Sequence, residues 1–193
     1  MKKTSTYIAI LLLAAALILP GCARPPTEEM NNAIEAVTMA ENDANAVRYA
    51  GSTLARAQEA LRRMHSEADA RNFDAARVSA AEAAALASRA ISEGQTWALR
   101  TREEASALLL ALRPEADQTE QSIRAAQAAG LDLDYAELGR NLETARMDLA
   151  RGEVALAGNR YNEALERGRD TRIGLNDINQ RLTMAATVVS AKR

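Results

Sequence analysis

Small apolar residues, most often alanine, recur every three or four positions along most of this 193-residue chain. That spacing places them on one face of an α-helix, and such a face must be buried against other helices. Alanine also has the best intrinsic helix propensity. Alternating runs of β-branched residues, which would indicate strands, are missing until the last few positions. The sequence therefore predicts an all-α fold.

Interruptions of the helical spacing predict where the helices end. Gly51, within "YAGST", is expected to break or kink the first helix. The segments "ADARNFDAAR" and "AGNRYNEAL" are each expected to turn the chain between two helices. Pro114 is expected to end or kink the helix that starts at Phe73. The segment "LDLDY" offers Asp132 or Asp134 as the N-cap of the following helix.

The two turning segments look like copies of one another, 88 residues apart. Both follow the pattern Leu-x2-Ala-x3-Leu-x11-aromatic-x2-Ala, which describes a helix, a tight corner and a returning helix. The aromatic residue of each copy is expected to be largely buried beside its corner. The predicted architecture is a set of tandem antiparallel helical hairpins in an elongated bundle, with a first unit at 27–112 and a second at 114–191. The matched residues are Leu54, Ala57, Leu61, Phe73 and Ala76 in the first copy and Leu142, Ala145, Leu149, Tyr161 and Ala164 in the second.

The amino terminus has the pattern of a bacterial export signal. Two lysines precede an apolar run from Tyr7 to Leu19, which is shorter than the roughly 20 residues that span a bilayer core. A positive start, an apolar core and small residues before a cut are typical of a secretory signal peptide. Cys22 follows directly and is the only cysteine, so the chain cannot form an internal disulfide.

The segment Leu19-Pro20-Gly21-Cys22 resembles a bacterial lipobox. The resemblance implies that residues 1–21 are a lipoprotein signal peptide and that Cys22 is acylated on its sulfur and on its new amino group. Residues 22–26 would then form the lipidated anchor and spacer. Ala23 stands where a signal for inner-membrane retention usually has Asp, which implies sorting to the outer membrane, facing the periplasm. The alternative is an ordinary signal peptide followed by an unrelated cysteine.

Two further resemblances concern the helical part. The segment "GNRYNEALERG" resembles the opening of the second helix of a tetratricopeptide repeat, in which a turn, an aromatic residue and an alanine recur. Residues 26–93 resemble a family of bacterial envelope lipoproteins with the domain of unknown function DUF4398. The residues that carry this likeness are Tyr49-Ala50, Leu54, Ala57, Leu61 and Asn72-Phe73. It implies a helical exported domain and nothing about activity.

The charge of the chain gives no reason to expect nucleic acid as a partner. Without residues 1–21 the chain has 22 basic and 26 acidic side chains, a net charge of −4. Every basic residue of this mature part except Lys192 is arginine, interleaved with Glu and Asp. We expect these arginines mainly to form a solvated surface of ion pairs. The alternative is a face that binds an anionic ligand, with Arg140, Arg160, Arg167 and Arg169 as candidates.

Candidate catalytic and metal-binding residues are few. His65 is the only histidine, and no pair of soft ligands remains for zinc or copper. Asp132, Asp134 and Glu137 lack the full oxygen-ligand loop of a calcium site, so helix capping is the favoured interpretation. Trp97 lies on a helical stripe and is expected to pack between helices, with a partner-facing anchor as the alternative. We expect neither catalysis nor a cofactor.

Together these patterns favour a structural or interaction protein of the cell envelope. We expect a helical scaffold, held at the outer membrane by the lipid on Cys22, that presents a helix face to a protein partner. The alternative is a binding module for peptidoglycan or lipid that uses the four candidate arginines.

Replacing Cys22 by serine tests the predicted anchor. Serine offers no thiol for acylation, so we expect Cys22→Ser to lose lipid labelling and to remain as uncut precursor or become soluble. Fatty-acid labelling and membrane fractionation measure the two effects. A serine variant that is cut normally and still sediments with membranes would contradict the lipobox prediction.

Overall fold

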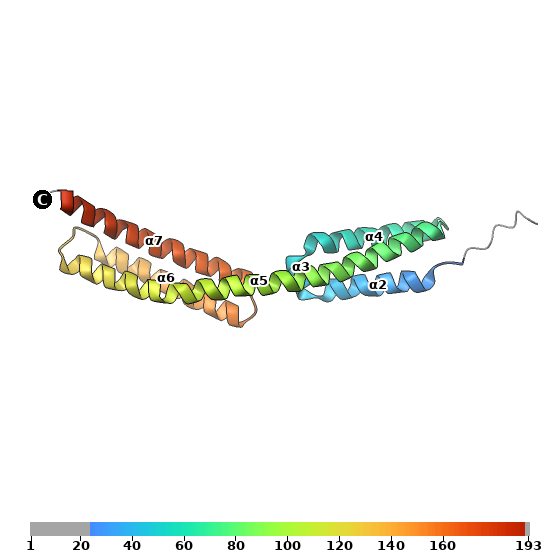
Figure 1. Ribbon diagram of the computed structural model, residues 1–193, viewed down its shortest axis with the longest axis horizontal. Helices are drawn as coiled ribbons and strands as arrows, with labels where there is room; N and C mark the ends of the chain where they lie inside the picture. Colours follow the sequence, from blue (N-terminus) through green and yellow to red (C-terminus); the bar gives the residue numbers. More distant parts are fainter. Residues whose placement is uncertain (1–23, 192–193) are drawn as a thin grey trace, which may run out of the picture. The chain divides into compact units, whose positions relative to one another are not determined.

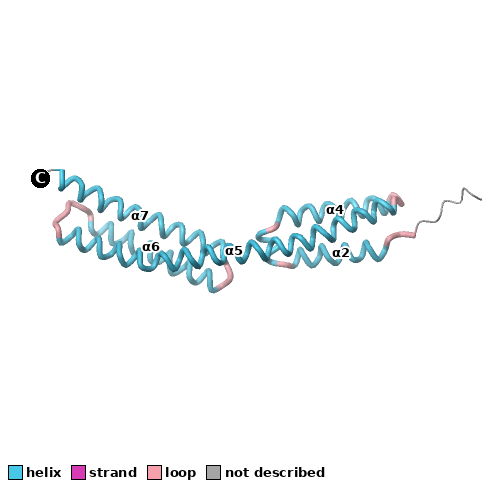
Figure 2. The backbone as a smooth tube through the Cα atoms, viewed as in Figure 1, coloured by secondary structure: helices cyan, strands magenta, loops and turns pink. Residues whose placement is uncertain are grey.

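The computed structural model describes residues 24–191, and all regular structure in this range is helical (Figures 1 and 2). The all-α prediction is confirmed. The signal peptide and Cys22 lie outside the described residues. The helices are α2 (Thr27–Asn42), α3 (Ala44–Tyr49), α4 (Gly51–Asp69), α5 (Phe73–Ala128), α6 (Tyr135–Ala157) and α7 (Tyr161–Ala191).

The helices form two compact units, which divide between Gly94 and Gln95, within α5. The first unit contains α2, α3, α4 and the first part of α5, and the second contains the rest of α5 with α6 and α7. The predicted boundary near Pro114 is wrong, because α5 continues through this proline. Proline has no N–H to donate to the carbonyl of Leu110, four residues earlier. Both residues are exposed, so water can donate a hydrogen bond to that carbonyl.

Two breaks shape the start of the first unit. The break expected at Gly51 is confirmed, since α3 ends at Tyr49 and α4 begins at Gly51. A second break, at Asp43, was not predicted. The Asp43 carboxylate accepts hydrogen bonds from the backbone N–H groups of Asn45 (2.9 Å) and Ala46 (2.7 Å), and so caps α3. This new start sets which face of α3 is buried.

The core of the first unit consists largely of alanine, which lets its helices approach closely. Gly94 of α5 marks the closest approach. A Cβ atom at this position would lie 2.5 Å from the backbone nitrogen of Ala46 and 2.6 Å from the carbonyl carbon of Asn45. Helix α5 therefore touches the backbone of α3, and only glycine fits at the contact. The buried residues are Ala33, Val37, Ala40, Ala46, Ala50, Leu54, Ala57, Ala60, Met64, Ala80, Ala83, Leu86, Ala87 and Ala90.

The second unit combines a leucine-rich helix with glycine notches. A Cβ atom on Gly152 of α6 would lie 2.9 Å from Leu109, and one on Gly168 of α7 would lie 2.7 Å from Leu108. Both leucines belong to α5 and are buried. The two glycines therefore make room for leucine side chains, a knob-into-hole arrangement that holds α5 against the α6–α7 hairpin.

The corners of the two hairpins have the same backbone geometry. The left-handed residues are Arg71 (φ 59°) and Asn159 (φ 57°), which are 88 positions apart. In the first corner, Asn72 N–H bonds Glu67 O at 2.8 Å and Arg71 N–H bonds Ala68 O at 2.9 Å. The matching bonds in the second corner, from Arg160 to Ala155 and from Asn159 to Leu156, measure 2.9 and 3.2 Å. Both corners are therefore Schellman motifs, 88 residues apart as the pattern predicts, although the α5–α6 corner at Gly130 has the same bonds.

The aromatic residues beside the corners, Phe73 and Tyr161, are largely but not fully buried, which agrees with the prediction. The Tyr161 hydroxyl donates a 2.8 Å hydrogen bond to Asn159 Oδ1. Ala76 and Ala164, one turn after each aromatic residue, are fully buried.

Replacing Gly94 by alanine tests the close approach of α5 to α3. The new methyl group cannot avoid backbone atoms by a rotamer change, so the helices must separate, at a cost of about 1–3 kcal/mol of unfolding free energy. The matched control is Gly139→Ala in α6, where a Cβ atom meets no other atom within 4 Å. Helix propensity predicts that the control gains up to about 1 kcal/mol.

Chemical denaturation of the chain from Ala23 onward measures both variants, because it contains every described residue. Equal stability of Gly94→Ala and Gly139→Ala would contradict the proposed contact.

Candidate functional site

The Trp97 side chain is 51% exposed on the part of α5 that belongs to the second unit. The guanidinium carbon of Arg100, one turn later, lies 5.2 Å from the centre of its ring, within the range of a cation–π contact. The expectation that Trp97 packs between helices is wrong. The buried stripe of this part of α5 begins with Ala98 and Ala105, two full turns apart, and the tryptophan lies beside it.

The exposed tryptophan is part of a larger polar surface. Glu104 lies two turns beyond Trp97 on the same side of α5, and its carboxylate accepts a 3.1 Å hydrogen bond from Arg169 of α7. We call Trp97, Arg100, Glu104 and Arg169 the Trp97 surface. It contains two of the predicted partner-binding residues, Trp97 and Arg169, and an acidic residue, Glu104, that the sequence did not single out.

Two other candidate arginines lie in a groove between α6 and α7. Its volume is about 270 Å³, and we call it the arginine groove. The residues that line it are Ala150, Arg151, Val154, Arg160, Glu163 and Arg167. The fourth candidate, Arg140, lines neither surface; it is exposed near the start of α6, and its side chain forms no ion pair with the described residues. The four candidates therefore separate into three places.

A comparison of the two copies of the pattern could have identified two arginines of the groove from the sequence alone. A shift of 88 positions places Arg160 on Asn72 and Arg167 on Ser79, so both arginines are specific to the second copy. Arg151 and Val154 were missed because helical spacing alone does not show which exposed residues of α6 face α7.

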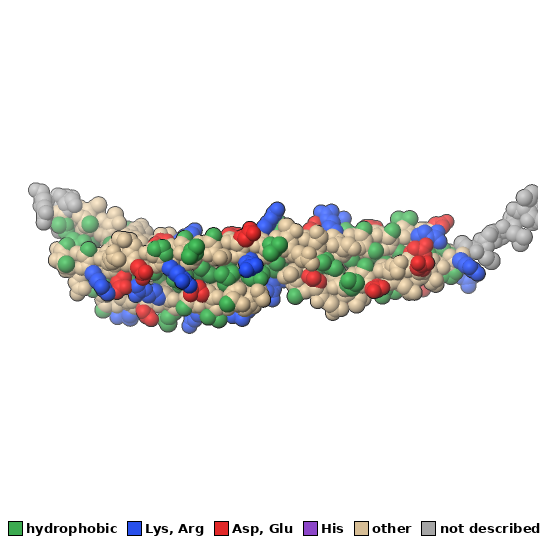
Figure 3. All heavy atoms as spheres, turned by 60° about the horizontal axis from the view of Figure 1, so that its bottom comes forward, with side chains coloured by type: hydrophobic (Ala, Val, Ile, Leu, Met, Phe, Trp, Pro, Cys, Tyr) green, Lys and Arg blue, Asp and Glu red, His purple; other side chains and the backbone are tan. Residues whose placement is uncertain are grey.

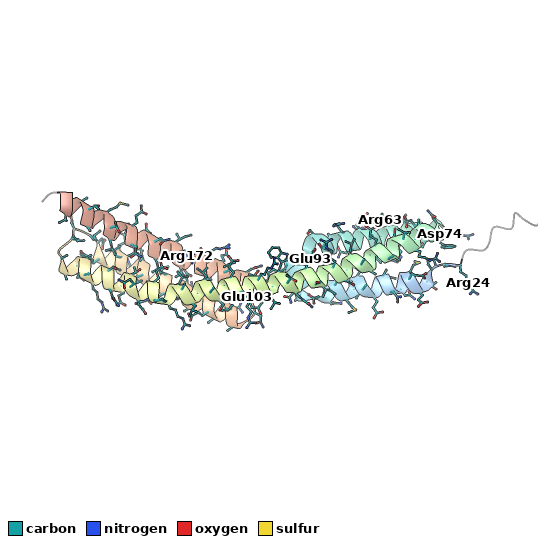
Figure 4. The ribbon with its side chains drawn as sticks, in the orientation of Figure 1. Arg24, Arg63, Asp74, Glu93, Glu103 and Arg172 are labelled. Atoms are coloured by element: carbon teal, nitrogen blue, oxygen red, sulfur yellow. The ribbon has the colours of Figure 1, made fainter. Side chains whose placement is uncertain are left out.

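The face seen in Figure 3 carries interspersed basic and acidic side chains, and several arginines pair with acids on neighbouring helices. Arg77 bonds Glu29 of α2 at 3.0 Å, for example. Glu93, labelled in Figure 4, accepts 2.6 Å hydrogen bonds from the Thr53 hydroxyl and from Arg89. These bonds, the threonine bond first, lower the pKa of the Glu93 carboxyl. Such pairs agree with the expected solvated surface of ion pairs.

The structure also places the residues considered for metal binding. Asp134 caps α6 by accepting the Glu137 N–H at 2.9 Å, as predicted, and the Glu137 carboxylate pairs with Arg181 at 3.0 Å. His65 is exposed on α4. Within residues 24–191, His, Asp and Glu side chains form no group of three that could hold a metal ion. No helix in this range is both long and apolar enough to span a membrane.

Comparison of the chain with protein families, curated proteins and solved structures finds no match. The resemblances to a lipobox, to the envelope-lipoprotein family and to tetratricopeptide repeats therefore stay predictions. The Trp97 surface and the arginine groove are therefore the features that bear on function.

Fluorescence quenching tests the exposure of Trp97, which is the only tryptophan of the chain. We expect acrylamide to quench the folded protein nearly as strongly as the unfolded chain, because half of the ring is open to solvent. Iodide should quench more strongly than caesium, since Arg100 attracts anions to the ring, and Arg100→Gln should reduce this difference. Blue-shifted emission that is protected from acrylamide would contradict the exposed position.

Proposed function

We propose that this protein is a lipid-anchored helical scaffold of the bacterial envelope that binds a protein partner in the periplasm through the Trp97 surface. The observation that carries the proposal is the exposed indole ring of Trp97 with Arg100 stacked against it. The proposed role is non-catalytic and requires no cofactor.

The composition of the Trp97 surface supports a protein partner. Tryptophan and arginine are the residue types that most often dominate binding energy at protein interfaces, because a large flat side chain loses much water when a partner covers it. The Glu104–Arg169 pair lies two helical turns from Trp97, and both of its side chains are exposed, as is typical of the polar rim of an interface. An aromatic anchor with a charged rim thus matches the usual anatomy of a binding surface.

The anchor part of the proposal depends on the amino-terminal sequence alone. The lipobox-like segment ends at Cys22, and α2 begins only five residues later, at Thr27. A fully extended chain of five residues spans at most about 18 Å. The start of α2 would therefore lie close to the membrane surface in the lipidated protein.

A second candidate function is a binding module for peptidoglycan or lipid. The observation that favours it is the meeting of Arg160 and Arg167 in the arginine groove. This surface shares no residue with the Trp97 surface, so variants can test the two functions separately.

Crosslinking in intact cells at native abundance tests the protein partner. We expect one envelope protein to be recovered with the wild-type chain and to be lost with Trp97→Ala. The matched control is Leu110→Ala, which removes another exposed large side chain (70% exposed) from the same helix and unit. Recovery of the wild-type chain alone with several crosslinkers, or equal loss of the partner in both variants, would contradict the proposal.

A further inference from the structure

We infer that the arginine groove of the second unit is a binding site for an oxyanion of the phosphate class. This inference deepens the second candidate function above and does not depend on the lipid anchor or on the Trp97 surface.

Three arginines line one small groove. Arg151 comes from the last turns of α6, Arg160 from the corner and Arg167 from the second turn of α7. Glu163 is the only acidic residue among the lining side chains. Arginine presents a planar fork of N–H donors that matches the oxygen atoms of phosphate, so such a cluster suits a phosphate group.

The ion pairs of these arginines are either long and shared or partly exposed. Asp148, which is mostly buried, lies 3.5 Å from Arg151 and 3.4 Å from Arg167, and a second acid, Asp170, lies 3.9 Å from Arg167. Arg160 has one close partner, Glu163, at 2.8 Å, and both side chains of that pair are about half exposed. Exposed ion pairs contribute little to stability, so the Arg160 guanidinium can turn toward a phosphate at small cost.

The first unit provides an internal comparison. Its corner has the same backbone, but Asn72 and Ser79 stand where the second unit has Arg160 and Arg167. Of the three groove arginines, only Arg151 has an arginine at the equivalent position of the first unit. That arginine, Arg63, pairs with Glu82 at 2.6 Å. Because the backbones match, the difference in charge comes from the side chains alone. Phosphate binding is therefore expected in the second unit and not in the first.

The groove also has an apolar part. Val154 lies among the arginines and is 65% exposed, although valine would gain from burial. A phosphate that carries an apolar group could cover it. Inorganic phosphate and the headgroup of an anionic phospholipid share the required chemistry, and the experiment below distinguishes them.

The test measures binding to the chain from Ala23 onward, which contains every described residue and no lipid. Inorganic phosphate is titrated in one arm by calorimetry. In the other arm, the protein is sedimented with vesicles of phosphatidylglycerol and, as the uncharged comparison, of phosphatidylcholine. Binding of phosphate in solution identifies a soluble phosphate as sufficient, whereas binding only to phosphatidylglycerol identifies the lipid headgroup; both results support the inference.

Four variants locate the site. Arg160→Gln and Arg167→Gln should each weaken binding roughly tenfold, since each removes charge-assisted hydrogen bonds. Glu163→Gln should strengthen it, because it removes the carboxylate that competes with phosphate. The matched control Arg63→Gln, at the corner of the first unit, should leave binding unchanged.

A fifth variant moves a guanidinium without changing the charge. A Cβ atom on Gly158 would lie 2.9 Å from Nη1 of Arg160, and the first unit has Ala70 at the equivalent position. Gly158→Ala should therefore displace the Arg160 side chain, keep the fold and weaken binding.

Three results would overturn the inference: no binding in either arm, equal binding to both kinds of vesicle, or equal losses in Arg160→Gln and Arg63→Gln. Trp97→Ala should bind phosphate as the wild type does. Loss of the protein partner in that variant with phosphate binding intact would therefore separate the two functions.

Discussion

Close approach between helices is the constraint on which the rest of this structure depends. Alanine and glycine at buried positions let backbones meet at distances that larger side chains prevent. Gly94 brings α5 against the first turn of α3, and Gly152 and Gly168 receive leucine side chains of α5. Because the core of the first unit contains few large side chains, the stability of that unit must come from many small, well-fitted contacts.

The repeated corner shows how one backbone can support different surfaces. Both hairpins end in the same Schellman motif, with a non-glycine residue in the left-handed region at Arg71 and at Asn159. The corner geometry depends on backbone hydrogen bonds and on the alanines that follow, so the outward-facing positions are free to differ. In the first unit those positions are mostly small and polar, and in the second they form the arginine groove.

Exposed charges have two different roles on this surface. Pairs such as Arg77–Glu29 connect neighbouring helices through charged side chains that lie outside the alanine-rich buried faces. Arg100 instead stacks on an exposed tryptophan, and two of the groove arginines, Arg151 and Arg167, share Asp148 at 3.5 and 3.4 Å. The second kind of contact is easily exchanged for a ligand, which is why function is proposed at those places and not along the paired faces.

The sequence by itself determined the features that depend on local interactions. Helical spacing predicted the all-α fold, and turn chemistry predicted both corners and the cap at Asp134. Tertiary structure decided what depends on neighbours. Pro114 lies on an exposed side of α5 and so does not end it, and Trp97 lies outside a buried stripe that the packing of Ala98 and Ala105 defines. The arginine groove likewise exists only because a corner brings α6 and α7 together. Spacing along a chain shows that a helix has a buried face, but the helices packed against it decide which residues that face contains.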